Sequence, residues 1–135
     1  MMAAQQEPAL MPIRVRIAGG VALAWLGMYV HNVADLPNMT LLSPESLYPG
    51  IVWLSLLGLA LSKSGGLWAL YPLLGWTWLN LVGGFLTVLP LPTLPFKPEQ
   101  TARHYAFHMV YAVAQLPPLW TLHREVRLRG HALAP

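Results

Sequence analysis

The chain of 135 residues contains no cysteine and few charged residues. Without cysteine it has no disulfide bonds, thiolate metal sites, iron–sulfur clusters or cysteine nucleophile. Any metal would need histidine, carboxylate or amide ligands. Charged residues make up 10% of the chain, compared with about 25% in ordinary soluble domains. So few charges are too few to cover the surface of a soluble domain.

Hydrophobic residues make up 56% of the chain and fall in long runs without charge. A transmembrane helix needs about 20 consecutive, mostly apolar residues. The runs therefore predict an all-α, polytopic membrane protein whose transmembrane domain, residues 13–123, is a four-helix bundle. The expected spans are residues 13–34, 46–62, 67–89 and 102–122. Arg14 and Arg16 before the first run also fit a signal peptide, but no small-x-small cleavage site follows it.

Lysine and arginine at the ends of these spans predict the orientation, because cytoplasmic loops carry an excess of both. One side has six: Arg14, Arg16, Lys63, Arg124, Arg127 and Arg129. The other side has Lys97 and Arg103. We therefore expect both termini in the cytoplasm, with residues 1–12 as a disordered tail and residues 124–135 as a basic tail.

The net charge of +3 does not indicate nucleic-acid binding. The basic residues stand singly or in pairs beside apolar runs and form no basic, aromatic-interleaved face. The lipid bilayer is the expected partner. A small-residue track in the first span, Gly20, Ala24 and Gly27, allows another helix to approach closely. Such a track also suits a second membrane protein or a second copy of the chain.

Polar residues in the fourth span are patterned. His104, His108, Tyr111 and Gln115 have offsets of four, seven and eleven, which place them on one stripe of a helix. In the expected topology, the first span ends on the same side of the membrane with His31 and Asp35, which are also four residues apart. We therefore expect the two polar edges to face each other. By rise per residue, Asn80 in the third span reaches a depth similar to that of Gln115.

The first hypothesis for this cluster is a metal site formed by His31, Asp35, His104 and His108. Side chains four apart on a helix are about 5–6 Å apart at Cβ, so two such pairs can converge on one Zn, Cu or Fe ion. A haem held by His31 and either His104 or His108 is an alternative. Asn80, Tyr111 and Gln115 are the further candidates for cofactor contact.

Other hypotheses use the same residues differently. His31, Asp35 and His108 could perform acid–base catalysis, isomerising or hydrolysing a lipid-soluble substrate, although no nucleophile-elbow sequence is present. The polar side chains could instead satisfy one another by hydrogen bonds near the lipid headgroups. The protein could also be a structural accessory subunit of a larger membrane complex. Both enzymatic and non-enzymatic functions therefore stay open at this point.

Overall fold

The computed structural model describes residues 11–95 and 97–132. These residues form four α-helices and no strand: α1 (Ile13–Asp35), α2 (Pro44–Leu61), α3 (Leu70–Leu86) and α4 (Ala102–Ala132). The predicted all-helical class is therefore confirmed. Of the two predicted tails, residues 1–10 and 133–135 lie outside the described residues.

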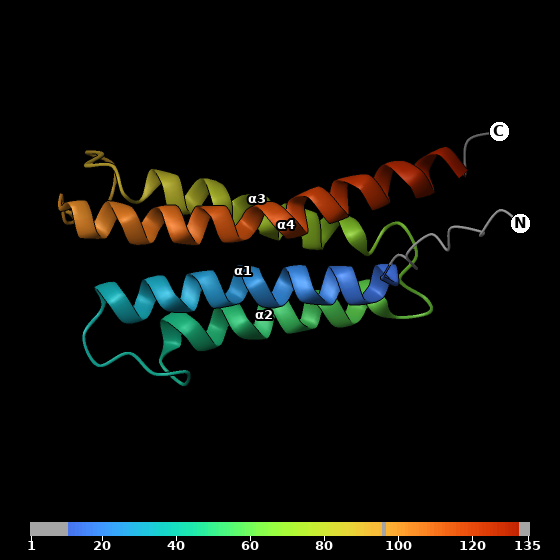
Figure 1. Cartoon of the computed structure of the whole chain (residues 1–135), viewed down its shortest axis with the longest axis horizontal. Coiled ribbons are helices and arrows are strands. Elements are labelled where there is room, and N and C mark those ends of the chain that lie inside the picture. Colours follow the sequence, from blue (N-terminus) through green and yellow to red (C-terminus); the bar gives the residue numbers. More distant parts are fainter. Residues whose placement is uncertain (1–10, 96, 133–135) are drawn as a thin grey trace, which may run out of the picture.

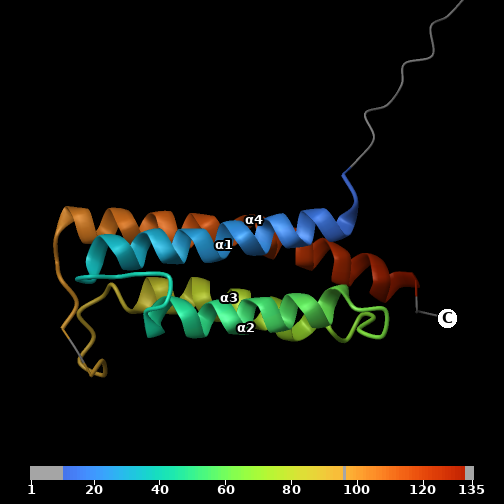
Figure 2. The same ribbon diagram turned by 90° about the horizontal axis from the view of Figure 1, so that it is seen from below.

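The four helices run side by side, each antiparallel to its two neighbours (Figures 1 and 2). α1 packs against α4 and α2, and α3 packs against the same two helices. The beginning of α1, the end of α4 and the α2–α3 connection lie at one end of the structure, hereafter the terminal end (Figure 1). The end of α1, the beginning of α4 and the 87–101 connection lie at the opposite end, hereafter the loop end.

Residues on the small-residue track allow close contact between α1 and α4. A Cβ atom added at Gly20 would lie 3.1 Å from the Cα atom of Pro118. A Cβ atom added at Gly27 would overlap the Cβ atom of Ala114. Because these residues have small side chains or none, α1 and α4 pack closely along the face that the sequence pattern predicts.

The bounds of α3 are narrower than the predicted span 67–89. A turn occupies residues 62–69, where Gly66 adopts a left-handed φ of 51° that suits glycine, and the helix begins only at Leu70. At the other end, Pro90 disfavours helical backbone at Leu89, and the helix stops at Leu86. α3 is therefore 17 residues long.

α4 is longer than the predicted span 102–122, because it continues through the basic segment to Ala132. Pro117 and Pro118 lie inside it, and prolines in a helix interior commonly cause kinks. In Figure 1 the second half of α4 (red) runs at an angle to the first half (orange). The arginines at residues 124–129 are thus displayed on a helix.

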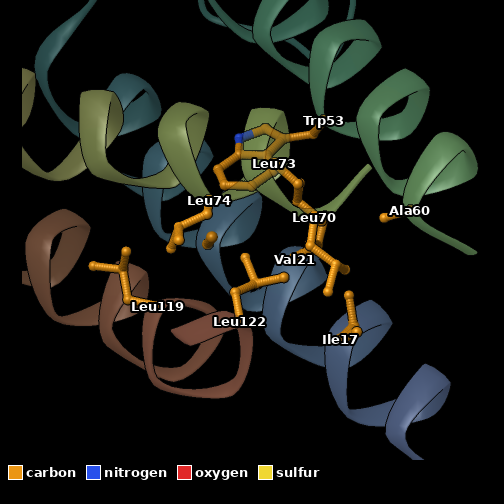
Figure 3. Packing of buried hydrophobic residues seen from close by; sticks show 10 residues of the cluster. Ile17, Val21, Trp53, Ala60, Leu70, Leu73, Leu74, Leu119 and Leu122 are labelled. Carbon is orange, nitrogen blue, oxygen red and sulfur yellow. The ribbon is translucent and has the colours of Figure 1, made fainter. Parts of the chain in front are cut away.

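The hydrophobic core lies toward the terminal end and receives side chains from all four helices (Figure 3). Ile17, Leu70, Leu73 and Leu122 are at most 1% exposed. Trp53 is also 1% exposed and packs edge to face on Trp76, with ring centroids 6.3 Å apart. This apolar core holds the helices together and leaves the loop end to polar side chains.

Two of the helices, α1 and α2, are long and apolar enough to cross a membrane, both by a small margin. Many large apolar side chains on all four helices are nevertheless exposed. Leu54 on α2 is 70% exposed, Leu79 on α3 is 61% exposed and Trp120 on α4 is 69% exposed.

Candidate metal-binding site

The four side chains that the first hypothesis assigns to a metal lie together at the loop end. His31 and Asp35 lie on the last turns of α1, and His104 and His108 lie on the first turns of α4. The ring centroids of His31 and His108 are 4.2 Å apart, and those of His104 and His108 are 4.4 Å apart. The structure therefore brings together all four side chains singled out in the sequence.

The imidazole of His31 is oriented by Asn32, a side chain that the sequence hypotheses did not include in the cluster. The Asn32 amide nitrogen donates to the carbonyl oxygen of Glu45 at 3.0 Å. That carbonyl is free because Pro49, four residues on in α2, has no N–H with which to bond it. The amide oxygen of Asn32 therefore faces His31, 3.1 Å from Nδ1, and can only accept. It follows that Nδ1 of His31 carries a proton.

The imidazole of His108 is oriented in the same way by α3. Its Nδ1 donates to the carbonyl oxygen of Gly84 at 2.7 Å. Gly84 lies in the last turn of α3, where carbonyl groups have no partner within the helix. Nδ1 therefore carries a proton, and in the neutral ring Nε2 keeps its lone pair for a metal or another proton.

Asp35 is the only acidic group of the cluster. Its Oδ2 atom lies 3.2 Å from Nε2 of His31 and 2.7 Å from Nδ1 of His104, yet neither approach has the angle of a hydrogen bond. Its side chain is 9% exposed, and it sits at the end of α1, where the helix dipole is unfavourable for a negative charge. Asp35 therefore favours a nearby positive charge.

Three polar atoms of the cluster are buried without a hydrogen-bond partner among the described residues: Nε2 of His31, Oδ2 of Asp35 and Nε2 of His104. Leaving a buried polar atom unpaired costs about 1–3 kcal/mol. Several such atoms at one place are characteristic of a site completed by an ion, a proton or water.

Three of the four side chains are close enough to share one metal ion. One ligand atom each from His31, Asp35 and His108 lie within 4.8 Å of one another. Two ligands on a tetrahedral zinc ion, with bonds of about 2.0–2.1 Å, are about 3.4 Å apart. The 3.2 Å between Nε2 of His31 and Oδ2 of Asp35 already matches this separation, and the ligand atom of His108 lies within 4.8 Å of both. His104 lies outside this group and contacts Asp35 instead.

The same geometry does not fit a haem. With metal–nitrogen bonds of about 2.0 Å, two imidazoles on opposite faces of one iron have ring centroids about 6 Å apart. The rings of His31 and His108 are closer than this, in edge contact at 4.2 Å. The rings of His31 and His104 are 6.2 Å apart, but the carboxylate of Asp35 contacts both of them. Neither pair leaves space for a flat macrocycle.

The three other predicted polar residues lie below the cluster, toward the middle of the helices. The hydroxyl of Tyr111 donates to Oδ1 of Asn80 at 2.7 Å, and the Tyr111 ring centroid is 5.6 Å from that of His31. Gln115 donates to the carbonyl oxygen of Ala24 at 3.1 Å and does not bond Asn80. Tyr111 therefore connects the cluster to α3, whereas Gln115 joins α4 to α1.

The sequence hypotheses gave Asn32 and Gly84, which orient the two histidines, no role in the site. Asn32 follows His31 directly, and Pro49 indicates that the Glu45 carbonyl has no partner within its helix. The pairing of Asn32 with this carbonyl, however, depends on how α1 packs on α2.

Comparisons with protein-family models, curated proteins and solved structures find no match for this chain. Its function is therefore inferred from its own geometry.

Proposed function

We propose that the protein spans the membrane as a four-helix bundle and binds one divalent transition-metal ion at the loop end through His31, Asp35 and His108. The observation that carries the metal proposal is the 3.2 Å approach of His31 Nε2 to Asp35 Oδ2. Because Nδ1 of His31 donates to Asn32, a neutral His31 presents only a lone pair to the carboxylate. A cation bound by both atoms would make this close approach favourable.

Membrane insertion is supported by the outward-facing apolar side chains described above. A soluble helix usually covers its outer face with charged residues, but these helices carry leucine, valine, phenylalanine and tryptophan there. The positions of the basic residues add further support. The six lysines and arginines that predict the cytoplasmic side belong to the terminal end, and Lys97 and Arg103 belong to the loop end. The metal site is then non-cytoplasmic, and both termini are cytoplasmic.

The ligand set favours zinc or iron(II). Two imidazole nitrogens and one carboxylate oxygen suit borderline divalent metals, and this combination with open positions is known for both catalytic zinc and non-haem iron. Copper is a further metal that imidazole binds well. When bound, such an ion would act as a Lewis acid toward a group at its open position.

The side chains around the ligands are arranged as a supporting shell. Asn32 and Gly84 accept the Nδ1–H groups of His31 and His108, which would leave both Nε2 atoms free to bind a metal. Nδ1 of His104 lies 2.7 Å from the same carboxylate oxygen of Asp35, Oδ2, that His31 approaches. In this proposal His104 is a positioning residue.

The test is a titration of the purified, detergent-solubilised and chelator-treated protein with Zn²⁺ in competition with a chromophoric chelator. We expect one ion per chain. His108→Ala should lower the affinity by more than about a hundredfold, because even the loss of an outer-shell partner costs about 10–100-fold. His131→Ala is the matched control, since His131 is an exposed histidine at the far end of the same helix. Equal affinities in the two variants would refute the site.

Acid–base catalysis is the second candidate, because the positive charge that Asp35 favours can also be a proton on His31. The His31 ring would then be an imidazolium paired with the Asp35 carboxylate. The same carboxylate also contacts the imidazole of His104. A lipid-soluble substrate would be its target. A protein that binds no metal but keeps His31 protonated in NMR spectra at neutral pH would support this alternative against the metal site.

A further inference from the structure

A groove of about 610 Å³ lies between α3 and α4, away from the metal cluster and toward the terminal end. Its walls are apolar, with Trp78 from α3 and Leu116 and Trp120 from α4. Leu81 and Leu119 complete the apolar lining, and the polar lining residues are His123 and Arg127, one turn apart on α4. The groove thus is apolar along most of its walls and has a polar, cationic end.

Trp78 determines which nitrogen of His123 can bind a ligand. The indole nitrogen of Trp78 donates to Nε2 of His123 at 2.9 Å. An indole N–H can only donate, so Nε2 must accept, and the proton of the neutral His123 ring is on Nδ1. His123 is exposed, and its Nδ1–H group is available to an acceptor. The Trp78–His123 contact therefore presents a fixed hydrogen-bond donor at the groove.

The positive charge of Arg127 is not neutralised within the described part of the chain. Arg129 pairs with Glu125 at 2.7 Å, and this contact occupies the acidic side chain nearest in sequence. Arg127 is exposed and forms no ion pair with any described residue. A guanidinium group beside a free imidazole N–H suits the oxygens of a phosphate, which both groups can bind together.

The position of this polar end agrees with the level of a lipid headgroup. In the proposed topology α4 enters the cytoplasm near His123, and the apolar walls of the groove lie inside the bilayer. An acyl chain can lie along the apolar walls of the groove while the phosphate of the same lipid contacts Arg127. Charge complementarity and the division into apolar and cationic parts therefore indicate the same class of ligand.

We propose that the groove between α3 and α4 binds an anionic glycerophospholipid, with its phosphate held by Arg127 and the Nδ1–H group of His123. The site rests on the proposed membrane insertion but is independent of the metal. Retention of the protein in membranes after an alkaline carbonate wash tests insertion alone, so the two ideas can fail separately.

The experiment measures lipid binding to the detergent-purified full chain by native mass spectrometry. The probes are phosphatidylglycerol, which is anionic, and phosphatidylcholine, which carries no net charge. We expect tighter binding of phosphatidylglycerol, and a loss of about tenfold in Arg127→Gln, as for a charge-assisted hydrogen bond. Arg124→Gln is the matched control, because Arg124 is exposed on the same helix and does not line the groove. It should bind as the wild type does.

Two further measurements identify the ligand and its position. Trp78→Phe keeps an aromatic ring but removes the donor to His123, so phosphatidylglycerol binding should weaken several-fold. Inorganic phosphate at millimolar concentration should not displace the lipid, because it cannot contact the apolar walls of the groove. Equal phosphatidylglycerol binding in the Arg127 and Arg124 variants would overturn the proposal. Displacement by phosphate, or equal binding of both lipids, would overturn it too.

Discussion

The imidazole rings of His31 and His108 meet edge to face, with centroids 4.2 Å apart and 74° between their planes. The two residues belong to α1 and α4, whose packing places them together. The polar cluster therefore depends on the same interface as Gly20 and Gly27, which precede His31 in α1. Changes in that interface should affect both stability and the site.

The interface can be tested with two glycines of α1. An alanine at Gly27 would overlap Ala114 on α4, so we expect Gly27→Ala to destabilise the fold by about 1–3 kcal/mol through overpacking. A Cβ atom at Gly19 meets nothing within 4 Å, and Gly19→Ala should stabilise the helix by up to about 1 kcal/mol. Thermal unfolding in detergent, followed by circular dichroism, measures both. A stabilising Gly27→Ala would contradict the packing of α1 on α4.

Much of this interface could be predicted from the sequence. The four-residue spacing of His31 and Asp35, and the stripe from His104 to Gln115, each define one face of a helix. The track of Gly20 and Gly27 marks the face on which a helix can approach. The contact between the two faces therefore follows from local periodicity together with the antiparallel arrangement that the predicted topology gives.

The support given to His31 by Asn32 provides a second prediction. Asn32→Leu removes the acceptor for the His31 Nδ1–H group and leaves the Glu45 carbonyl without this donor. We expect zinc affinity to fall by about 10–100-fold, as for other outer-shell partners. Zinc competition titrations of Asn32→Leu beside His131→Ala measure this change. An unchanged affinity, in a variant that keeps its helix content, would show that Asn32 does not orient the ligand.

The hydrogen bond between Tyr111 and Asn80 provides a third prediction. Asn80→Leu leaves the partly buried Tyr111 hydroxyl without its acceptor and should cost about 1–3 kcal/mol. Tyr111→Phe removes the hydroxyl itself and should cost about 0.5–1.5 kcal/mol. Because the two residues share one interaction, the double variant should cost less than the sum of the single changes. Strict additivity in thermal unfolding would indicate that the bond contributes nothing.

The absence of cysteine makes the proposed orientation directly testable. Ser64 lies in the turn between α2 and α3, Thr93 lies in the 87–101 connection, and both are exposed. In intact cells a membrane-impermeant maleimide should label Thr93→Cys and spare Ser64→Cys until the membrane is permeabilised. The opposite labelling would reverse the topology, and equal labelling of both sites would argue against membrane insertion.

Other parts of the site could not be predicted from sequence periodicity. The bond from Asn32 to Glu45 requires Pro49 to free a carbonyl and α1 to reach that turn of α2, a packing relationship between distant residues. The same limit applies to His104: its spacing places it on the stripe with His108, but only the tertiary packing separates it from the ligand group. The end of α4 could not be predicted either, because charged residues end an apolar run without ending a helix.

In the proposed site His31, His108 and Asp35 hold one metal ion. X-ray absorption spectroscopy at the zinc edge, on protein loaded with one equivalent of Zn²⁺, tests it most directly. We expect multiple scattering from two imidazoles, and nitrogen and oxygen ligands at about 2.0–2.2 Å. His108→Ala should lose one imidazole from this shell, and His131→Ala should lose none. A shell without imidazole, or one that is identical in the wild type and His108→Ala, would contradict the site.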